Sequence, residues 1–182
     1  MMFPNRILPI DDPRLRQPSM PVIAMDDETR ALAAHMFRVM DAARGAGLAA
    51  VQIGVPRRLI VVDVEDASGL RHRLALANPE IVEASRAQVA GGEGCLSMPG
   101  VVQQVVRAET VVARYLDLDG RAASVRADGM FAVCLQHEID HTNGIVFTDR
   151  MSRLRRDQAR RQYSRNLRQA ARPAISLEGG LQ

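Results

Sequence analysis

The sequence contains no lysine and no tryptophan, and aromatic residues make up only 3% of its 182 residues. The hydrophobic fraction of 47% is still enough for one globular domain, whose core must consist of Val, Leu, Ile, Ala and Met. No apolar run approaches the roughly 18 residues of a membrane-spanning helix. Pro4 interrupts the first residues, and Asp11 and Asp12 soon follow, which argues against a signal peptide. We therefore expect a cytoplasmic protein with no membrane segment.

Because lysine is absent, all 24 basic residues are arginine, and they are unevenly distributed. Acidic side chains outnumber basic ones over residues 1–149, whereas residues 150–182 contain nine arginines and two acids. The nine are Arg150, Arg153, Arg155, Arg156, Arg160, Arg161, Arg165, Arg168 and Arg172. One interpretation is an ordinary solvated helix face. The other is docking onto phosphate groups by bidentate hydrogen bonds and counterion release, which suits such a density of arginine on an otherwise acidic chain.

The stretch QHEIDH at residues 136–141 places two imidazoles and a carboxylate on one face of a predicted helix. At about 100° per residue, His137 and His141 lie roughly 40° apart around the helix axis, and Glu138 lies about 60° beyond His141 on the same side of the helix. This spacing suits two nitrogen ligands of one divalent metal, with the carboxylate beside a metal-bound water. A half-buried helix with two hydrogen-bonded histidines would show the same pattern. A second segment with a thiol, EGCLS at residues 93–97, favours the metal site.

The two cysteines of the chain, Cys95 and Cys134, are the candidates for a third metal ligand. Cys134 precedes His137 on the same helix, so a set with His141 would extend over about 10 Å at about 1.5 Å per residue. A metal with ligand bonds of about 2.0–2.3 Å cannot reach all three. We therefore predict that Cys95 is the third ligand and that Cys134 packs as a small buried hydrophobe facing the site. A disulfide is disfavoured, because nothing else in the chain indicates an oxidising compartment.

The remaining pattern predicts many short strands and few helices. Helices are expected from the N-cap residues Asp26 and Asp27 to about Arg44, over about 129–143, and over about 153–171. An extended run is predicted over 48–52, and strands over 59–64, 74–77, 81–90, 101–106, 110–116 and 122–125. Because strands and helices do not alternate regularly, we expect an α+β fold, with antiparallel sheets wrapped around a central metal-binding helix and a C-terminal helix.

We expect a single domain over residues 1–172. The basic helix over 153–171 belongs to it, but its apolar stripe is thin, so it should dock along a narrow seam. Pro173 should end this helix, and residues 173–182 are expected to form a disordered tail.

Three segments follow one another in the chain: GAGLAAVQ at residues 45–52, EGCLS at 93–97 and QHEIDH at 136–141. Together they closely resemble the three signature motifs of peptide deformylases, and the similarity extends from the first helix to residues 149–151. Each motif alone is unspecific, whereas the ordered set is specific. The resemblance implies a hydrolase that removes the formyl group from the N-formylmethionine of nascent bacterial polypeptides and releases formate.

The resemblance also implies the metal site. Cys95, His137 and His141 would bind one divalent metal and leave a fourth position for water. Glu138 would take the proton from that water and later deliver it to the leaving amine. One thiolate and two imidazoles hold Zn(II) more tightly than Fe(II) by the usual affinity order, yet the resemblance implies Fe(2+) in the working enzyme. The sequence does not distinguish Fe, Zn, Ni and Co in a given preparation.

Further residues obtain roles from the same resemblance. The side-chain amide of Gln52 and the backbone N–H of Leu96 would stabilise the oxyanion. Without its flanking segment, Gln52 would be interpreted as an ordinary strand glutamine. Gly45, Ala46 and Gly47 would hydrogen-bond to the substrate backbone in strand fashion, which requires a close approach of two main chains.

On the metal helix, Met130, Val133 and Cys134 resemble residues that line the pocket for the methionine side chain. Simple core packing is a compatible role for them. Glu93 and Arg107 resemble a structural ion pair of the family rather than catalytic groups.

The chain departs from the family pattern at three positions. Ala46 stands where a larger aliphatic residue is usual, Val102 where many members have an arginine, and Thr142 where leucine is usual. None of these changes removes a metal ligand, the base or an oxyanion donor. They therefore concern substrate range and rate more than the type of reaction.

Three functions have to be compared. The first is an active deformylase that acts on formylated nascent peptides and docks on the ribosome through its Arg-rich C-terminal helix, as the helix-ended branch of the family implies. The second is an inert paralogue that binds ribosome or RNA, which is disfavoured because every chemical group is present. The third is an HExxH metalloprotease, whose third ligand would usually follow on the C-terminal side. No histidine follows His141, and the next glutamate is Glu178.

Overall fold

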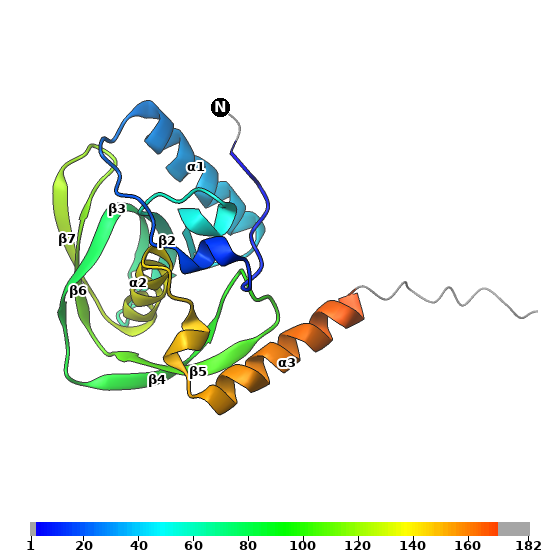
Figure 1. Ribbon diagram of the computed structural model, residues 1–182. Coiled ribbons are helices and arrows are strands. Elements are labelled where there is room, and N and C mark those ends of the chain that lie inside the picture. Colours follow the sequence, from blue (N-terminus) through cyan, green and yellow to red (C-terminus); the bar gives the residue numbers. More distant parts are fainter. Residues whose placement is uncertain (1–2, 171–182) are drawn as a thin grey trace, which may run out of the picture.

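The computed structural model describes residues 3–170, which form two antiparallel sheets and three α-helices (Figure 1). The helices are α1 (Asp27–Ala42), α2 (Gly129–Thr142) and α3 (Arg153–Ala170). The strands are β1 (Gly47–Ala49), β2 (Leu59–Glu65), β3 (Arg71–Ala84), β4 (Gln88–Gly94), β5 (Val102–Ala108), β6 (Val111–Leu116) and β7 (Ala122–Ala127). Three short 3-10 helices, η1 (Pro13–Arg16), η2 (Ala50–Ile53) and η3 (Phe147–Arg150), connect them.

The larger sheet has the strand order β1-β2-β3-β6-β7, and β4 and β5 form a separate two-stranded sheet. All pairs are antiparallel. Within these sheets β1 pairs only with β2, and β4 pairs only with β5, so each of these two strands has one free edge. Among residues 3–170, no helix has the length and apolar character needed to span a membrane.

Helix α2 lies between the two sheets and contacts strands of both, which confirms the predicted α+β class with a central helix (Figure 1). Its buried apolar residues occupy several sides, because Ala132 and Cys134 lie on either side of the stripe that contains Phe131 and Leu135. A helix that is apolar on most of its circumference must be covered on most sides. The sheets therefore hold its histidines in a fixed orientation.

The extended run predicted over 48–52 is wrong in its second half. Strand β1 ends at Ala49, and the chain turns into η2 over residues 50–53. The cause is local, because the Gln52 side chain folds back and its Oε1 accepts a hydrogen bond from the backbone N–H of Ala49 at 2.8 Å. Gly54, with a φ of 79°, then ends the turn in the left-handed region.

The strand predicted over 81–90 is in fact two strands. β3 continues through Asn78 and Pro79 as far as Ala84, with a register shift against β6 and a positive φ of 49° at Asn78. The chain then turns, and β4 begins at Gln88. The Asn78 side chain explains why the bulge is tolerated, because it donates to and accepts from the backbone of Val22.

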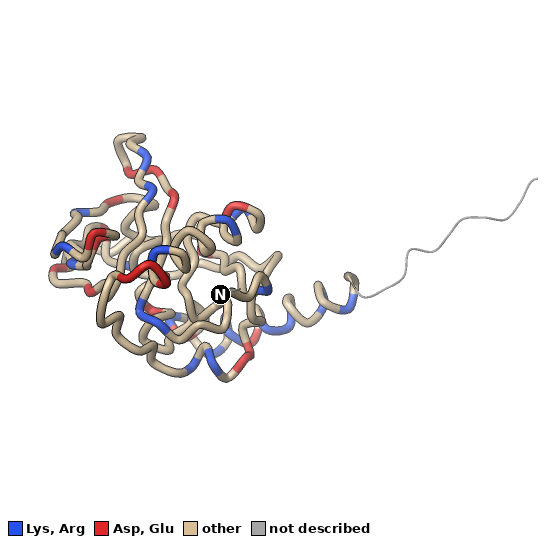
Figure 2. The backbone as a smooth tube through the Cα atoms, turned by 90° about the horizontal axis from the view of Figure 1, so that it is seen from above, with Lys and Arg blue, Asp and Glu red and all other residues tan. Residues whose placement is uncertain are grey.

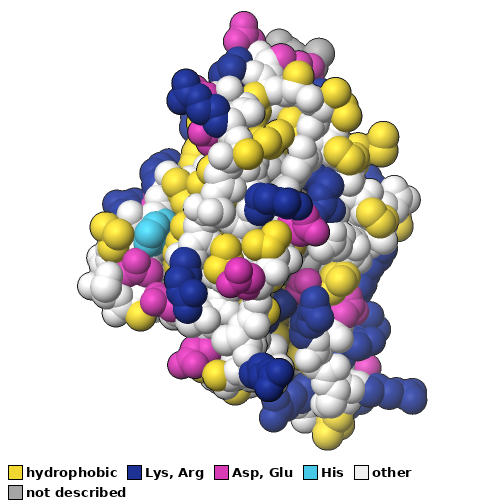
Figure 3. Space-filling model, turned by 90° about the vertical axis from the view of Figure 1, so that its left-hand side faces the viewer, with side chains coloured by type: hydrophobic (Ala, Val, Ile, Leu, Met, Phe, Trp, Pro, Cys, Tyr) yellow, Lys and Arg dark blue, Asp and Glu magenta, His cyan; other side chains and the backbone are white. Residues whose placement is uncertain are grey.

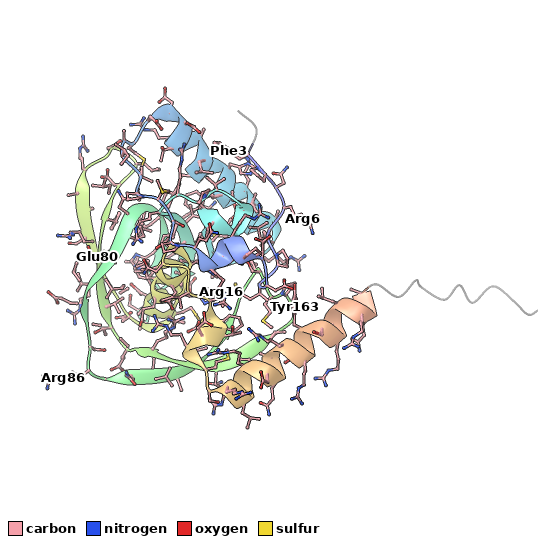
Figure 4. The ribbon with its side chains drawn as sticks, viewed as in Figure 1. Phe3, Arg6, Arg16, Glu80, Arg86 and Tyr163 are labelled. Carbon is pink, nitrogen blue, oxygen red and sulfur yellow. The ribbon has the colours of Figure 1, made fainter. Side chains whose placement is uncertain are left out.

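Helix α3 lies against the body through few residues, of which Ala159 and Tyr163 are buried. Tyr163 points from α3 toward the body, on the side where Arg16 lies (Figure 4). Figure 2 shows the rest of α3 projecting beyond the body, with arginines along it. Arg172 and the predicted tail over 173–182 lie outside the described residues, and the single domain over 1–172 stays a prediction.

Candidate active site

The thiol of Cys95 and the imidazoles of His137 and His141 meet in the interior. One ligand atom from each lies within 4.8 Å of the other two, and all three residues are buried. Cys95 Sγ and His141 Nε2 are 3.3 Å apart. Ligand atoms of a tetrahedral site with bonds of about 2.0–2.3 Å are separated by roughly 3.3–3.8 Å, so the group fits one metal ion.

Different elements position these three groups. Cys95 directly follows the end of β4, where the chain leaves the ribbon in a turn, and the histidines are four residues apart on α2. Burial, and to a smaller extent the charge of the neighbouring His137, lowers the pKa of His141. The ring is therefore kept in the neutral form that binds metals. Cys134 is also buried, but burial raises the pKa of its thiol, so it stays protonated as a small apolar group.

A carboxylate fixes the orientation of the first histidine. Nδ1 of His137 donates to Oε2 of Glu93 at 2.8 Å, which leaves Nε2 for the metal. Burial alone would raise the pKa of Glu93, but the hydrogen bonds from His137 and Arg107 outweigh it and lower the pKa to about 2. Glu93 is therefore ionised whenever the protein is folded at neutral pH.

The same carboxylate begins a buried ionic network. Arg107 donates from Nε and Nη2 to both oxygens of Glu93, at 2.7 and 3.0 Å, so the predicted Glu93–Arg107 pair is present. Arg107 also contacts Asp140, which in turn accepts from Arg150. Sequence reasoning assigned no role to Asp140, and it placed Arg150 among the nine arginines considered for phosphate docking, whereas the structure pairs Arg150 with Asp140. The sequence did contain an indication of a role for Asp140, because it is three residues after His137 and therefore lies near it on the same helix.

Glu138 is adjacent to His137 in α2, and one of its oxygens has no hydrogen-bond partner among the described residues. Its Oε2 is buried and unsatisfied among the described residues. Burial raises its pKa to about 7, close to the value that suits a general base at neutral pH. A Cβ atom at Gly47 would lie only 2.6 Å from Oε1 of Glu138, so glycine is required at this point of β1.

The amide of Gln52 reaches the same place from η2. While Oε1 is held by the backbone of Ala49, Nε2 lies 3.5 Å from Sγ of Cys95 and 3.2 Å from the hydroxyl of Ser97. The amide nitrogen is thus directed toward the thiol of the candidate metal site. Leu96 follows Cys95 in the turn and lines the cleft described next. Ser97 was not recognised from the sequence as a partner of Gln52.

A cleft of about 460 Å³ leads from the surface to Cys95, His137 and Glu138. Its walls include residues 45–47, beside the free edge of β1, and residues 92–94, beside the free edge of β4. The α2 residues Met130, Val133 and Cys134 also line it. A larger depression of about 820 Å³ lies against a different face of α2 and contains none of the three metal-ligating groups.

The backbone of Gly47 is free to bind an extended peptide. The carbonyl oxygen of Ala46 accepts from the N–H of Asp63, so the polar groups of Ala46 face β2. Because successive residues of a strand point their N–H and C=O groups to opposite edges, those of Gly47 face the free edge. Val102 lies on the opposite wall and is 65% exposed, whereas Thr142 is buried on α2 and its hydroxyl donates to the carbonyl oxygen of Ile139.

A buried group of one thiol and two imidazoles, a neighbouring carboxylate and an open cleft define the class, a hydrolase with a single metal ion. Comparison with known proteins gives the family, because residues 4–157 match the model of polypeptide deformylases. The chain belongs to this family, and it is a metal-binding hydrolase of protein biosynthesis that removes the formyl group from nascent polypeptides. The predicted family, fold class and activity are confirmed, and the inert paralogue is not favoured.

The chain resembles curated and solved members over almost its whole length. It is 46% identical over 172 residues to the peptide deformylase of Rhizorhabdus wittichii, which covers 91% of this chain and 97% of that protein. The solved deformylase of Legionella pneumophila shares 44% identity at a TM-score of 0.83, covering 92% and 98% of the two chains. That of Ehrlichia chaffeensis in complex with actinonin shares 38% identity at a TM-score of 0.85, covering 92% and 99%.

Proposed function

We propose that deformylation takes place at Cys95, His137 and His141, with Glu138 as the proton carrier. A divalent metal held by these three residues would supply Lewis-acid chemistry, lowering the pKa of a water and polarising the formyl oxygen. The observation that carries the proposal is the buried, unsatisfied Oε2 of Glu138 beside three mutually close ligand atoms. With a pKa of about 7, this carboxylate can accept a proton and return it to the leaving amine.

Gln52 and Leu96 stabilise the negative charge that develops on the formyl oxygen. The backbone N–H of Ala49 donates to Oε1 of Gln52 and fixes the amide group, whose Nε2 lies 3.5 Å from Cys95 Sγ, which supports this role. The backbone N–H of Leu96 is the second donor. Gly45, Ala46 and Gly47 bind the peptide backbone along the free edge of β1, and Met130, Val133 and Cys134 receive the methionine side chain.

The experiment measures formate release from formyl-Met-Ala-Ser before and after Glu138→Ala. We expect metal-dependent turnover that collapses in the variant while the metal stays bound. Glu80→Ala, which removes an exposed carboxylate paired with Arg114, is the matched control and should keep full turnover. If the wild-type protein loaded anaerobically with Fe(II) gives no formate, the inert paralogue is correct. Cleavage of internal peptide bonds would instead indicate a protease.

The working metal in this proposal is Fe(2+), with Zn, Ni or Co replacing it in some preparations. The mixed donor set of one thiolate and two imidazoles is compatible with each of these ions, so ligand chemistry alone does not select one. Metal analysis of protein purified without oxygen should find about one iron per active chain. Turnover that follows zinc content and not iron content would reject this assignment.

We further infer that α3 docks on the ribosome, which would keep the enzyme in the cytoplasm beside its nascent substrates. The helix contains seven arginines and one acid, and only Ala159 and Tyr163 are buried. Basic side chains also gather at the lower end of the face in Figure 3, the end at which Figure 1 places the start of α3. An exposed row of guanidinium groups suits phosphate backbones.

A set of charge-removing variants tests the docking. The test variant replaces four exposed arginines of α3 by glutamine: Arg155, Arg161, Arg165 and Arg168. The control replaces four exposed arginines of the body: Arg6, Arg86, Arg121 and Arg126. The α3 variant should bind ribosomes more weakly and with a flatter salt dependence, while turnover of formyl-Met-Ala-Ser stays within twofold. An unchanged salt slope would reject docking through α3.

A further inference from the structure

Arg44 stands at the cleft in an unusual conformation. It follows the end of α1, lines the cleft, and has a φ of 55°, one of two positive values at non-glycine positions among residues 3–170. The side chain is exposed and forms no ion pair with any described residue. The nearest acid in sequence, Asp41, is bound by Arg73 at 2.9 Å. A left-handed arginine is uncommon, and this one closes the end of α1, where the N–H of Gly45 donates to the carbonyl oxygen of Met40.

The other charges that line the cleft are neutralised or buried. Glu93 is paired with Arg107, and Glu138 is 4% exposed beside the metal ligands. The opposite wall contributes Gly92, Gly94 and Val102, which bear no charge. Within the part of the chain that the structure describes, Arg44 is therefore the one uncompensated cation of the cleft lining.

The course of the chain before β1 places Arg44 at a distance from Glu138. A Cβ at Gly47 would contact Glu138 and Cys134, whereas a Cβ at Gly45 would contact the side chain of Leu96. The chain thus runs outward from the catalytic carboxylate to Arg44. Residues 44–46 form a turn and a bend before β1, so the Cα atoms of Arg44 and Gly47 are at most about 11 Å apart. An extended peptide with its formyl group at the metal ligands brings its second or third residue alongside this guanidinium.

We propose that Arg44 is a specificity-determining residue for the sequence that follows formylmethionine. The cleft favours nascent chains with aspartate or glutamate at the second or third position over chains with lysine or arginine there. This inference rests on the proposed binding of the peptide along the free edge of β1. An ion pair at an exposed cleft rim is worth a few-fold in selectivity and weakens with salt.

The test compares kcat/KM for three peptides that differ at one position: formyl-Met-Ala-Asp-Ala, formyl-Met-Ala-Asn-Ala and formyl-Met-Ala-Lys-Ala. We expect Asp to exceed Asn by about threefold and Lys by about tenfold at low salt, with both ratios shrinking toward one as NaCl is added. A second series with the charged residue directly after methionine identifies whether Arg44 contacts the second or the third residue of the peptide.

Variants at position 44 then assign the effect. Arg44→Asn removes the charge and keeps a residue that tolerates the left-handed conformation, so the Asp/Lys ratio should fall to about one. Arg44→Glu should invert the ratio. The control is Arg86→Asn at the turn before β4, where Figure 4 shows Arg86 at the periphery, and it should keep the wild-type ratio.

Three results would overturn the inference. If the wild type turns over all three peptides equally, the cleft does not read charge, although deformylation itself stands. If Arg44→Asn keeps the wild-type Asp/Lys ratio, the preference has another origin. If no formyl peptide releases formate from the metal-loaded wild type, the proposed function and this inference fail together.

Discussion

Helices α2 and α3 are close in sequence and have opposite relations to the solvent. In α2 the residues from His137 to Thr142 are all buried. His137 is paired with Glu93 of β4 and Asp140 with Arg107 of β5, whereas Glu138 keeps an unsatisfied oxygen. In α3 only Ala159 and Tyr163 are buried, and the arginines other than Arg156 are exposed. Figure 2 shows α3 projecting beyond the body of the molecule.

The contrast between the two helices shows how burial constrains a charged side chain. An ionised group inside a protein must be hydrogen-bonded, and the bonds that satisfy it also fix its position. Glu93 orients His137 in this way, and a fixed ring orientation is what metal binding through the other ring nitrogen requires. A solvent-exposed arginine on α3 keeps its side-chain mobility and its electrostatic field, and both suit association with a large anionic partner.

The largest expected effect tests whether the buried group is one metal site. Cys95→Ala removes the only thiol among the three ligand atoms, so the metal content should fall and turnover should drop by at least about a thousandfold. Metal analysis and formate release measure both. Cys134→Ala is the matched control and should keep the metal. A Cys95→Ala protein that retains stoichiometric metal would contradict the proposed ligand set.

The second prediction compares the same residue type in the two environments. Arg107→Met leaves Glu93 and Asp140 buried without their shared partner, and should cost about 3–5 kcal/mol of unfolding free energy. Arg165→Met on α3 should change it by less than about 0.5 kcal/mol. Urea unfolding of both variants gives the comparison. Equal costs would mean that burial does not distinguish the two arginines.

The third prediction concerns the seam that holds α3. Tyr163 is 8% exposed, so Tyr163→Ala should destabilise the docked helix by about 1–3 kcal/mol and speed proteolysis within residues 153–170. Leu167→Ala, at a position 50% exposed, is the control and should change little. Equal protease rates for the two variants would show that Tyr163 does not anchor the helix.

The smallest effect extends the comparison to a charge at the surface of β2. Hydrogen bonds from Arg71 and Arg73 outweigh the cost of burial and lower the pKa of Asp63 from 3.8 to about 2. A depressed pKa gives stability above pH 4 that is lost as the pH falls through 2. Asp63→Asn should therefore cost about 1 kcal/mol at pH 7, because both guanidinium groups face solvent.

The check on this last effect is unfolding measured at several pH values. The difference between wild type and Asp63→Asn should shrink steadily below pH 4 and vanish near pH 2. A difference that stays constant down to pH 2 would show that Asp63 acts through its shape and not through its charge.

Local rules predicted much of this molecule, and their failures have physical causes. The helical spacing of His137 and His141 fixed their common face, and bond lengths excluded Cys134 in favour of Cys95. The run over 48–52 was predicted as extended because residue propensities take no account of a side chain that hydrogen-bonds to nearby backbone, as Gln52 does to the N–H of Ala49. The bulge at Asn78 depends on Val22, which is distant in sequence.

Primary structure alone was enough to predict the order of the motifs, the helix that holds two imidazoles and the accumulation of arginine near residue 160. The folded chain was needed to see that Asp140 and Arg150 complete the ionic network behind His137, and that Arg44 has no ion-pair partner among residues 3–170. The two kinds of information differ in range along the chain. Periodicity and composition act over a few residues, whereas burial and charge pairing are settled by segments that meet only when the sheets close around α2.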